Sequence, residues 1–216
     1  MLRGNARFVA GTPLHPRQDV ERRETLAHAQ EPHAALFGCS DSRLAAEIIF
    51  DKGLGDLFVV RNAGQVISDS VLGSLEYAVG VLHVPLILVL GHDECGAVRA
   101  AIDSQGPDPV ALPAHIDHIV QRIVPAVRQV ADAHAESGGH ITGPIDTTTI
   151  DALEVGREHL RHTVAELLEQ SELISQAVAD GELVVVGANY KLLEGTAVPD
   201  LIIGDTTIPD VAVDPE

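Results

Sequence analysis

The sequence has little aromatic character: its 216 residues include no tryptophan, two tyrosines and four phenylalanines, so aliphatic side chains must fill the core. It contains only two cysteines, which excludes a disulfide-dense scaffold. It has no run of about 18 apolar residues, so no membrane span is predicted. It also has neither Gly-x-Gly-x-x-Gly nor a Walker phosphate loop, so the common nucleotide-binding motifs are excluded.

Basic residues are scarce as well. The 14 Lys and Arg residues stand against 32 Asp and Glu residues, for a net charge of −18. Such a chain is a poor partner for nucleic acid or an anionic membrane surface, and we expect neither. The first residues contain no apolar run long enough for a signal peptide. We therefore expect a cytoplasmic location, in which both cysteines stay reduced.

Apolar runs alternate with helical patterns along the chain, which predicts an α/β fold. Strands are expected at residues 34–38, 56–61, 85–90 and 183–186, and helices at 44–50, 70–82, 95–102, 116–135 and 147–179. This alternation predicts a mostly parallel central sheet flanked by helices. With no linker or repeat in view, residues 1–216 are predicted to form a single domain.

The two ends and two internal segments are expected to be less regular. Residues 1–30 read as a partly helical arm, and about 200–216 as an acidic, proline-punctuated tail that is disordered or docks on a neighbouring subunit. Residues 103–113 and 137–144 are rich in turn formers and are predicted to be loops.

Two short segments contain both cysteines, and each follows a predicted strand. The first is Cys39-Ser-Asp-Ser-Arg43 and the second is His92-Asp-Glu-Cys95. Because the carboxyl ends of parallel strands meet at one edge of a sheet, two thiolates and an imidazole would come together there. This ligand set suits zinc, and three protein ligands leave the fourth position open, as in catalytic sites.

The same two cysteines and histidine are compatible with roles that involve no metal. Two buried structural cysteines with a packed histidine would give this pattern, and so would one disulfide in a secreted protein. A two-cysteine redox protein is disfavoured, since the cysteines lack Cys-x-x-Cys spacing.

The two segments, in this order, resemble the zinc signature of the β-class carbonic anhydrases, particularly the plant-type subgroup. The resemblance covers roughly residues 5–195 and includes the stretches 58–64, 73–79 and 89–97. It implies reversible hydration of carbon dioxide to bicarbonate and a proton, by attack of zinc-bound hydroxide. One Zn²⁺ per chain would be held by Cys39, His92 and Cys95. The resemblance also implies a homodimer or homotetramer, with the N-terminal arm packed on a partner subunit.

Asp41 and Arg43 take two arrangements in the family that the chain resembles. In a closed site, Asp41 is the fourth zinc ligand. In an open site, Asp41 pairs with Arg43 and can orient the nucleophile, and the planar guanidinium suits a carboxylate in this role. An ordinary structural salt bridge is the alternative for this pair.

The substrate pocket is expected by matched position alone. Gln30, Phe58 and Tyr77 correspond to pocket residues that approach the zinc of a neighbouring subunit in plant-type members. Ordinary core packing is the alternative for both aromatic residues, and an exposed position without a role is the alternative for Gln30. Leu36 stands where bicarbonate-inhibited members have tryptophan, so that effector site is expected to be absent or altered.

Two alternative functions stay open. On the same fold, the chain could hydrolyse a related small substrate such as carbon disulfide or carbonyl sulfide. It could also be a non-catalytic zinc-binding protein, although a structural site would need neither Asp41 nor Arg43. The eleven histidines do not single out a proton shuttle, and those near predicted helices, His159 among them, are expected to be solvated or packed.

Overall fold

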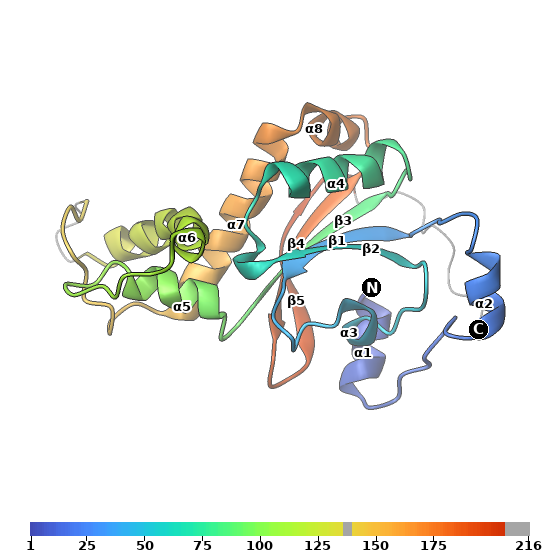
Figure 1. Cartoon of the computed structure of the whole chain (residues 1–216), viewed down its shortest axis with the longest axis horizontal. Helices are drawn as coiled ribbons and strands as arrows, with labels where there is room; N and C mark the ends of the chain where they lie inside the picture. Colours follow the sequence, from blue (N-terminus) through green and yellow to red (C-terminus); the bar gives the residue numbers. More distant parts are fainter. Residues whose placement is uncertain (136–139, 206–216) are drawn as a thin grey trace.

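A five-stranded sheet forms the centre of the computed structural model, which describes residues 1–135 and 140–205. Its order is β2-β1-β3-β4-β5 (Figure 1). The strands are β1 (Ala34–Cys39), β2 (Leu57–Asn62), β3 (Leu86–His92), β4 (Val184–Lys191) and β5 (Thr196–Ile203). The first four are parallel, whereas β5 pairs antiparallel with β4. The predicted mostly parallel α/β fold is confirmed.

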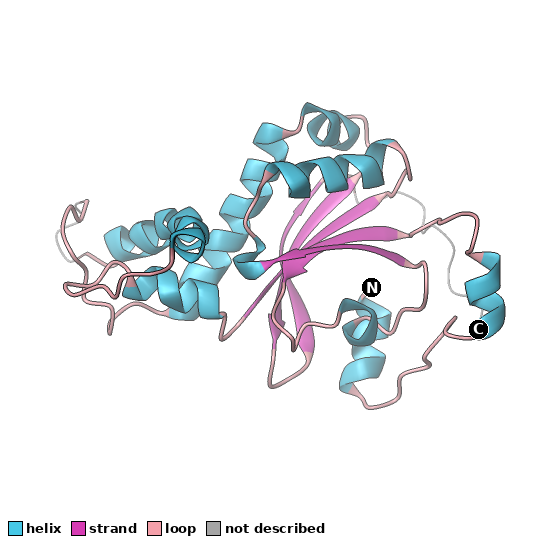
Figure 2. Cartoon of the chain, viewed as in Figure 1, coloured by secondary structure: helices cyan, strands magenta, loops and turns pink. Residues whose placement is uncertain are grey.

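Helices cover both faces of this sheet (Figure 2). On one face lie α4 (Asp69–Gly80), α8 (Glu172–Ala179) and much of α7 (Ala152–Gln170). The other core includes residues of α3 (Ala46–Ile49), α5 (Gly96–Asp103) and α6 (Ala114–Ala133), with α1 (Leu2–Val9) packed beside it. The short α2 (Val20–Thr25) and a 3₁₀ turn, η1 (Ala63–Gln65), complete the elements of the described residues.

The central strands are buried because both of their faces are covered. All six residues of β1 are buried, and alternate side chains enter opposite cores. Ala35 and Phe37 belong to the core under α4, α7 and α8, whereas Leu36 belongs to the core with α3, α5 and α6. A continuous apolar run is typical of a parallel strand covered in this way.

The C-terminal part differs from the prediction. The last predicted strand, 183–186, is longer as β4 and is not the last, because β5 follows it. Residues 200–203 of the predicted tail belong to β5, and residues 206–216 lie outside the described part of the chain. Pro199 lies in β5, opposite Ala188 and next to a register shift at Gly187/Ala188. A proline has no backbone N–H to donate, and an edge strand can accommodate it because only one side of the strand is paired.

The helix predicted at 147–179 is two helices. Ser171 has an extended backbone, and its Oγ accepts a hydrogen bond from the Ile174 N–H at 3.2 Å, which caps α8. The same hydroxyl donates to Oε1 of Glu76 on α4 at 2.7 Å. Side-chain capping thus ends one helix and begins the next within an unbroken apolar pattern. Of the loop predicted at 137–144, residues 137–139 lie outside the described part.

The N-terminal arm is partly helical, as predicted, and its first helix packs on its own chain. The Asn5 amide donates to the carbonyls of Ile49 and Gly195 at 3.2 and 2.8 Å, and its Oδ1 accepts the Ala197 N–H at 3.0 Å. Farther along, Arg17 forms a two-pronged ion pair with the buried Asp56 just before β2. Contact of the arm with a partner subunit stays a prediction.

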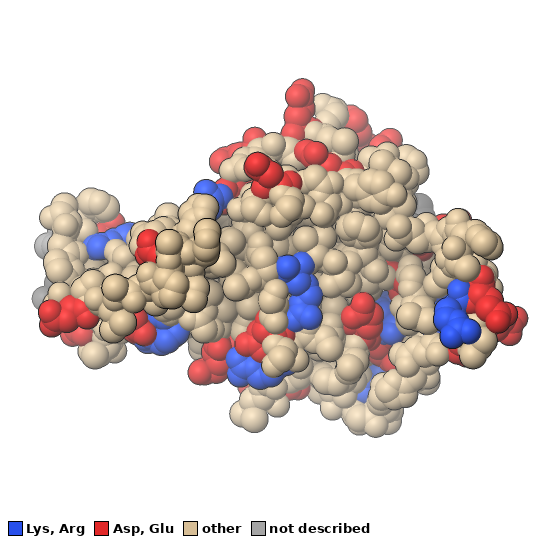
Figure 3. All heavy atoms as spheres, in the orientation of Figure 1, with Lys and Arg blue, Asp and Glu red and all other residues tan. Residues whose placement is uncertain are grey.

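Acidic side chains are spread over the face that Figure 3 shows, with several over α4 and α8 at the top. Basic side chains on this face lie singly or in small groups between them. Within the described residues, no helix is long and apolar enough to cross a membrane.

Candidate metal centre

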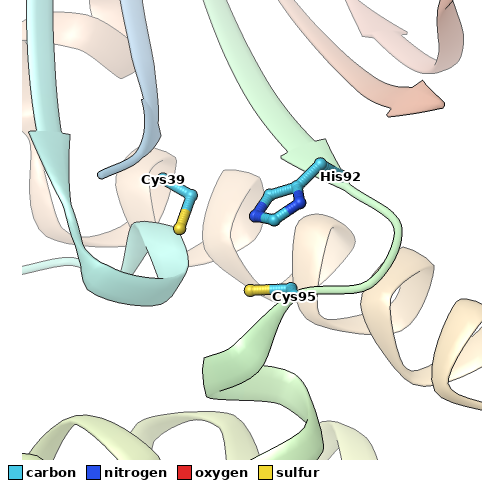
Figure 4. A group of neighbouring side chains, drawn as sticks. All are labelled: Cys39, His92 and Cys95. Atoms are coloured by element: carbon cyan, nitrogen blue, oxygen red, sulfur yellow. The ribbon is translucent and has the colours of Figure 1, made fainter. Parts of the chain in front are cut away.

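The two segments singled out in the sequence meet at the carboxyl edge of the sheet. Cys39 ends β1, His92 ends the adjacent β3, and Cys95 directly precedes α5 as its N-cap residue (Figure 4). The three side chains are buried and point toward one another, and their ligand atoms all lie within 4.8 Å of each other. The chain turns back from β2 to β3 across β1 here, which is the switch point where α/β sheets place their sites.

The imidazole of His92 is prepared to bind a cation. Its Nδ1 lies 2.7 Å from the Asp93 carbonyl oxygen. Since a carbonyl only accepts, Nδ1 carries the proton and Nε2 presents a lone pair. Nε2 is buried and has no hydrogen-bond partner. A buried acceptor left without a donor is costly unless it coordinates a metal, so the residues fit a metal ion.

The two thiols form a close pair that favours loss of one proton. A hydrogen bond from Cys95 holds the pKa of Cys39 well below its usual range, helped by His92 and by the Gly64 N–H at 3.4 Å from Sγ. That same bond, together with burial, raises the pKa of Cys95. A divalent cation bound here would displace the remaining protons and leave two thiolates. Because two thiolates balance Zn²⁺, the filled site is formally neutral.

Asp41 and Arg43 lie beside this cluster and are paired with each other. Arg43 donates from Nε to Oδ1 at 2.9 Å and from Nη2 to Oδ2 at 2.7 Å. The Arg43 side chain holds the pKa of Asp41 below its usual range, so the carboxylate stays charged. Asp41 is not a member of the metal-binding group formed by Cys39, His92 and Cys95. Asp41 is therefore paired with Arg43, which is the open one of the two arrangements described above.

Two arginines brace the turns that carry the ligands. Arg43 also donates from Nη2 to the Glu94 carbonyl at 3.2 Å and so ties the turn after β1 to the turn before α5. Arg61 donates to the Cys39 carbonyl at 2.9 Å and to the Asp41 carbonyl at 2.7 Å. Glu94 itself is exposed and has a left-handed backbone with φ 50°.

The predicted pocket residues do not join the metal cluster of their own chain. Phe58 on β2 and Tyr77 on α4 lie side by side, with ring centroids 6.1 Å apart. In the sheet, Phe58 is level with Ala35, four residues before Cys39, and at about 3.3 Å per residue this is about 13 Å from the ligand edge. Gln30 is exposed in the connection between α2 and β1.

Three supporting residues could not be assigned this role from the sequence. Gly64 and Arg61 lie between the two ligand segments, and neither has a local sequence pattern that points to the metal site. His159, grouped with the packed or solvated histidines, is buried and lies 2.7 Å from the Gly64 carbonyl. These contacts join residues up to 95 positions apart, so no local pattern could have signalled them.

Comparison with known proteins agrees with this geometry. Residues 34–197 match the family model described as "Carbonic anhydrase". Carbonic anhydrase 2 of Mycobacterium tuberculosis is 48% identical over 196 residues, covering 90% of this chain and 87% of that protein. The Aspergillus fumigatus β-carbonic anhydrase CafA superposes with a TM-score of 0.69 at 25% identity, covering 83% of this chain and 80% of the other.

A second solved structure similar to this chain is of a tetrameric protein. Two β-carbonic anhydrases of Sordaria macrospora are described as tetrameric, and one of them matches with a TM-score of 0.65 at 25% identity, over 82% of this chain and 84% of the other. The family match covers well over half of the chain and includes every predicted zinc ligand. The chain belongs to the β-class carbonic anhydrase family.

Proposed function

We propose that this chain catalyses the reversible hydration of carbon dioxide to bicarbonate and a proton, with one Zn²⁺ per chain as cofactor. The observation that carries the proposal is the buried group of two thiols and one imidazole, with a free Nε2 directed into it. Three ligands leave one tetrahedral position for the reaction. The relatives named carbonic anhydrase support the same assignment.

In this proposal Cys39, His92 and Cys95 hold the metal. When bound, zinc acidifies a water molecule and so supplies the nucleophile. Asp41 orients that nucleophile by accepting a hydrogen bond from it, and Arg43 keeps the carboxylate in place through its two-pronged contact. Because thiolates donate charge to the metal, the water is acidified less than at a three-histidine site, and activity should rise above neutral pH.

We further propose that Gln30, Phe58 and Tyr77 serve the metal centre of a second subunit in a homodimer or tetramer. Two features of the chain support this. The aromatic pair lies about 13 Å along the sheet from its own ligands. Tyr77 is 44% exposed beside β2, an edge strand that has no second partner strand in the described part of the chain.

We also propose a cytoplasmic location. Both cysteines are free thiols here, and a metal site made from them requires that they stay reduced. A reducing compartment provides that condition.

The test combines zinc analysis with stopped-flow carbon dioxide hydration of the purified protein. We expect about one zinc per chain and hydration that is lost in Cys39→Ser. Carbonyl sulfide and carbon disulfide belong in the same assay, because the ligand set alone does not separate these substrates from carbon dioxide. Zinc-loaded protein that leaves carbon dioxide unhydrated would refute the assignment, and turnover of a sulfur substrate instead would identify the rival activity.

A further inference from the structure

The feature that the reaction leaves unused is a histidine buried behind the metal centre. His159 lies on the inner side of α7, is 3% exposed, and approaches the Gly64 carbonyl through Nε2 at 2.7 Å. Because the carbonyl can only accept, Nε2 carries the proton and donates it. Nδ1 is then an acceptor, and it is buried without a partner.

Gly64 links this histidine to a metal ligand. Its carbonyl accepts from His159, and its own N–H donates to Sγ of Cys39 at 3.4 Å. Gly64 lies in η1 with φ 73°, where an added Cβ would be 2.8 Å from the Cβ of Ala97. The N–H and the carbonyl of Gly64 belong to consecutive peptide units joined at its Cα, and the tight packing at this residue restricts rotation between them. A bond that fixes the carbonyl therefore also helps to fix the direction of the N–H.

The next turn of α7 approaches the following residue more weakly, because the single hydroxyl hydrogen of Thr163 has two possible acceptors. Oγ1 of Thr163 lies 2.9 Å from the His159 carbonyl and 3.4 Å from the Gln65 carbonyl. Thus α7 contacts two consecutive residues of η1, and both contacts come from donors four positions apart on one face of the helix. No other helix of the described chain donates side-chain hydrogen bonds to η1.

Simple core packing explains these observations less well. An imidazole in this place loses its solvation and leaves Nδ1 without a donor, and both effects cost free energy. An apolar side chain would fill the same space at lower cost. The one bond that the imidazole makes, to the carbonyl of the residue whose N–H faces the Cys39 sulfur, accounts for a polar side chain here.

We propose that His159 is a positioning residue for the zinc ligand Cys39, acting through the backbone of Gly64, whose carbonyl it holds and whose N–H donates to Cys39. The proposal rests on the proposed zinc site. Its hydrogen bond keeps the Gly64 N–H directed at Sγ, which stabilises the thiolate and fixes its lone pairs toward the metal. Partners of this kind, one contact removed from the metal, change metal affinity by about 10-fold to 100-fold when they are lost.

The test measures zinc affinity by chelator competition, and the thiolate-to-metal charge-transfer band of the cobalt-substituted protein. His159→Leu should bind zinc about 10-fold to 100-fold more weakly. Its band should move to longer wavelength, since a thiolate without its hydrogen bond gives up charge more easily. His159→Gln places an amide N–H near the position of Nε2, so it should restore both properties. A merely structural role would not move the band.

The matched control is His162→Leu on the same helix, because His162 pairs with Gln129 at the surface at 2.9 Å. It should leave affinity and band unchanged. If His159→Leu does not fold, His159→Asn decides in its place, since its amide is too short to reach the carbonyl and should give the same losses.

A folded His159→Leu or His159→Asn protein with wild-type affinity and an unshifted band would overturn the proposal. So would His159→Gln losing as much affinity as His159→Leu. In both cases the proposed function would stand, because wild-type protein would still bind zinc and hydrate carbon dioxide. Wild-type protein that binds no zinc would refute the function itself.

Discussion

Acidification should destabilise this protein in part through His159, and comparison with a His159 variant should separate this effect from that of other titrating groups. Burial lowers the pKa of His159 from its usual 6.5 to about 4. In the unfolded chain the imidazole therefore takes up a proton as pH falls below 6.5, whereas in the folded protein it stays neutral until about pH 4. The stability that depends on the neutral ring is complete above pH 6.5 and is lost progressively between the two values. Linkage of these pKa values gives a loss of about 2 kcal/mol between pH 7 and pH 5.

The assay is urea unfolding of wild-type and His159→Gln protein at pH 7, 6 and 5, at one protein concentration. Other titrating groups, including the zinc ligands, are common to both proteins, so their effects cancel in the difference. His159→Gln should lose about 2 kcal/mol less than wild type over this range. Parallel stability curves for the two proteins would show that the folded imidazole takes up protons freely, and would refute the reasoning.

Three further outcomes are expected. Cys39→Ser and Cys95→Ser should each lose most of the zinc, measured by metal analysis of folded protein, and full retention in either would contradict the site. Arg43→Ala should lower carbon dioxide hydration by about 10-fold to 100-fold at pH 7 and pH 8.5, because charge-assisted hydrogen bonds of about 1.5–3 kcal/mol no longer hold Asp41. The rate of Arg43→Lys should lie between those of Arg43→Ala and wild type. The control Arg99→Ala, which breaks an exposed ion pair with Asp103, should hydrate carbon dioxide at the wild-type rate. Sedimentation at assay concentration should give a dimer or larger species, and a fully active monomer would exclude a pocket shared between subunits.

The parts of the fold that could be predicted are those governed by local patterns. Continuous apolar runs predicted β1 and β3, because a strand covered on both faces is apolar at every position. Apolar residues at helical spacing predicted α4 and α6, because only one face of such a helix is buried. The break at Ser171 was missed because the apolar pattern continues through it, although Ser171 is a typical N-cap residue three positions before Ile174. The strand at 196–203 was missed because Pro199 is typical of loops, and only its place at the sheet edge makes it acceptable.

The metal ligands could be predicted because each follows a strand, and the topology of a parallel sheet brings such residues together. The hydrogen bonds that hold the ligand segments in place could not be predicted. Arg61 and His159 act through backbone carbonyls, which any sequence supplies, so the partner of each donor carries no signature. The arrangement of Asp41 was left open for another reason: two positions of one carboxylate are compatible with the same residues, and only coordinates distinguish them.

The contact between α7 and η1 also has a consequence for the order in which the protein is made. Gly64 leaves the ribosome well before His159, which is 95 residues later in the chain. At about 5–20 residues per second, the ligands Cys39, His92 and Cys95 are all synthesised before the helix that steadies one of them, and the delay after Gly64 is about 5–20 s. A nascent chain therefore passes through a period in which it has every thiol needed for metal capture but lacks α7. If His159 positions Cys39 as proposed, we expect metal bound in that interval to be held more weakly than in the finished protein.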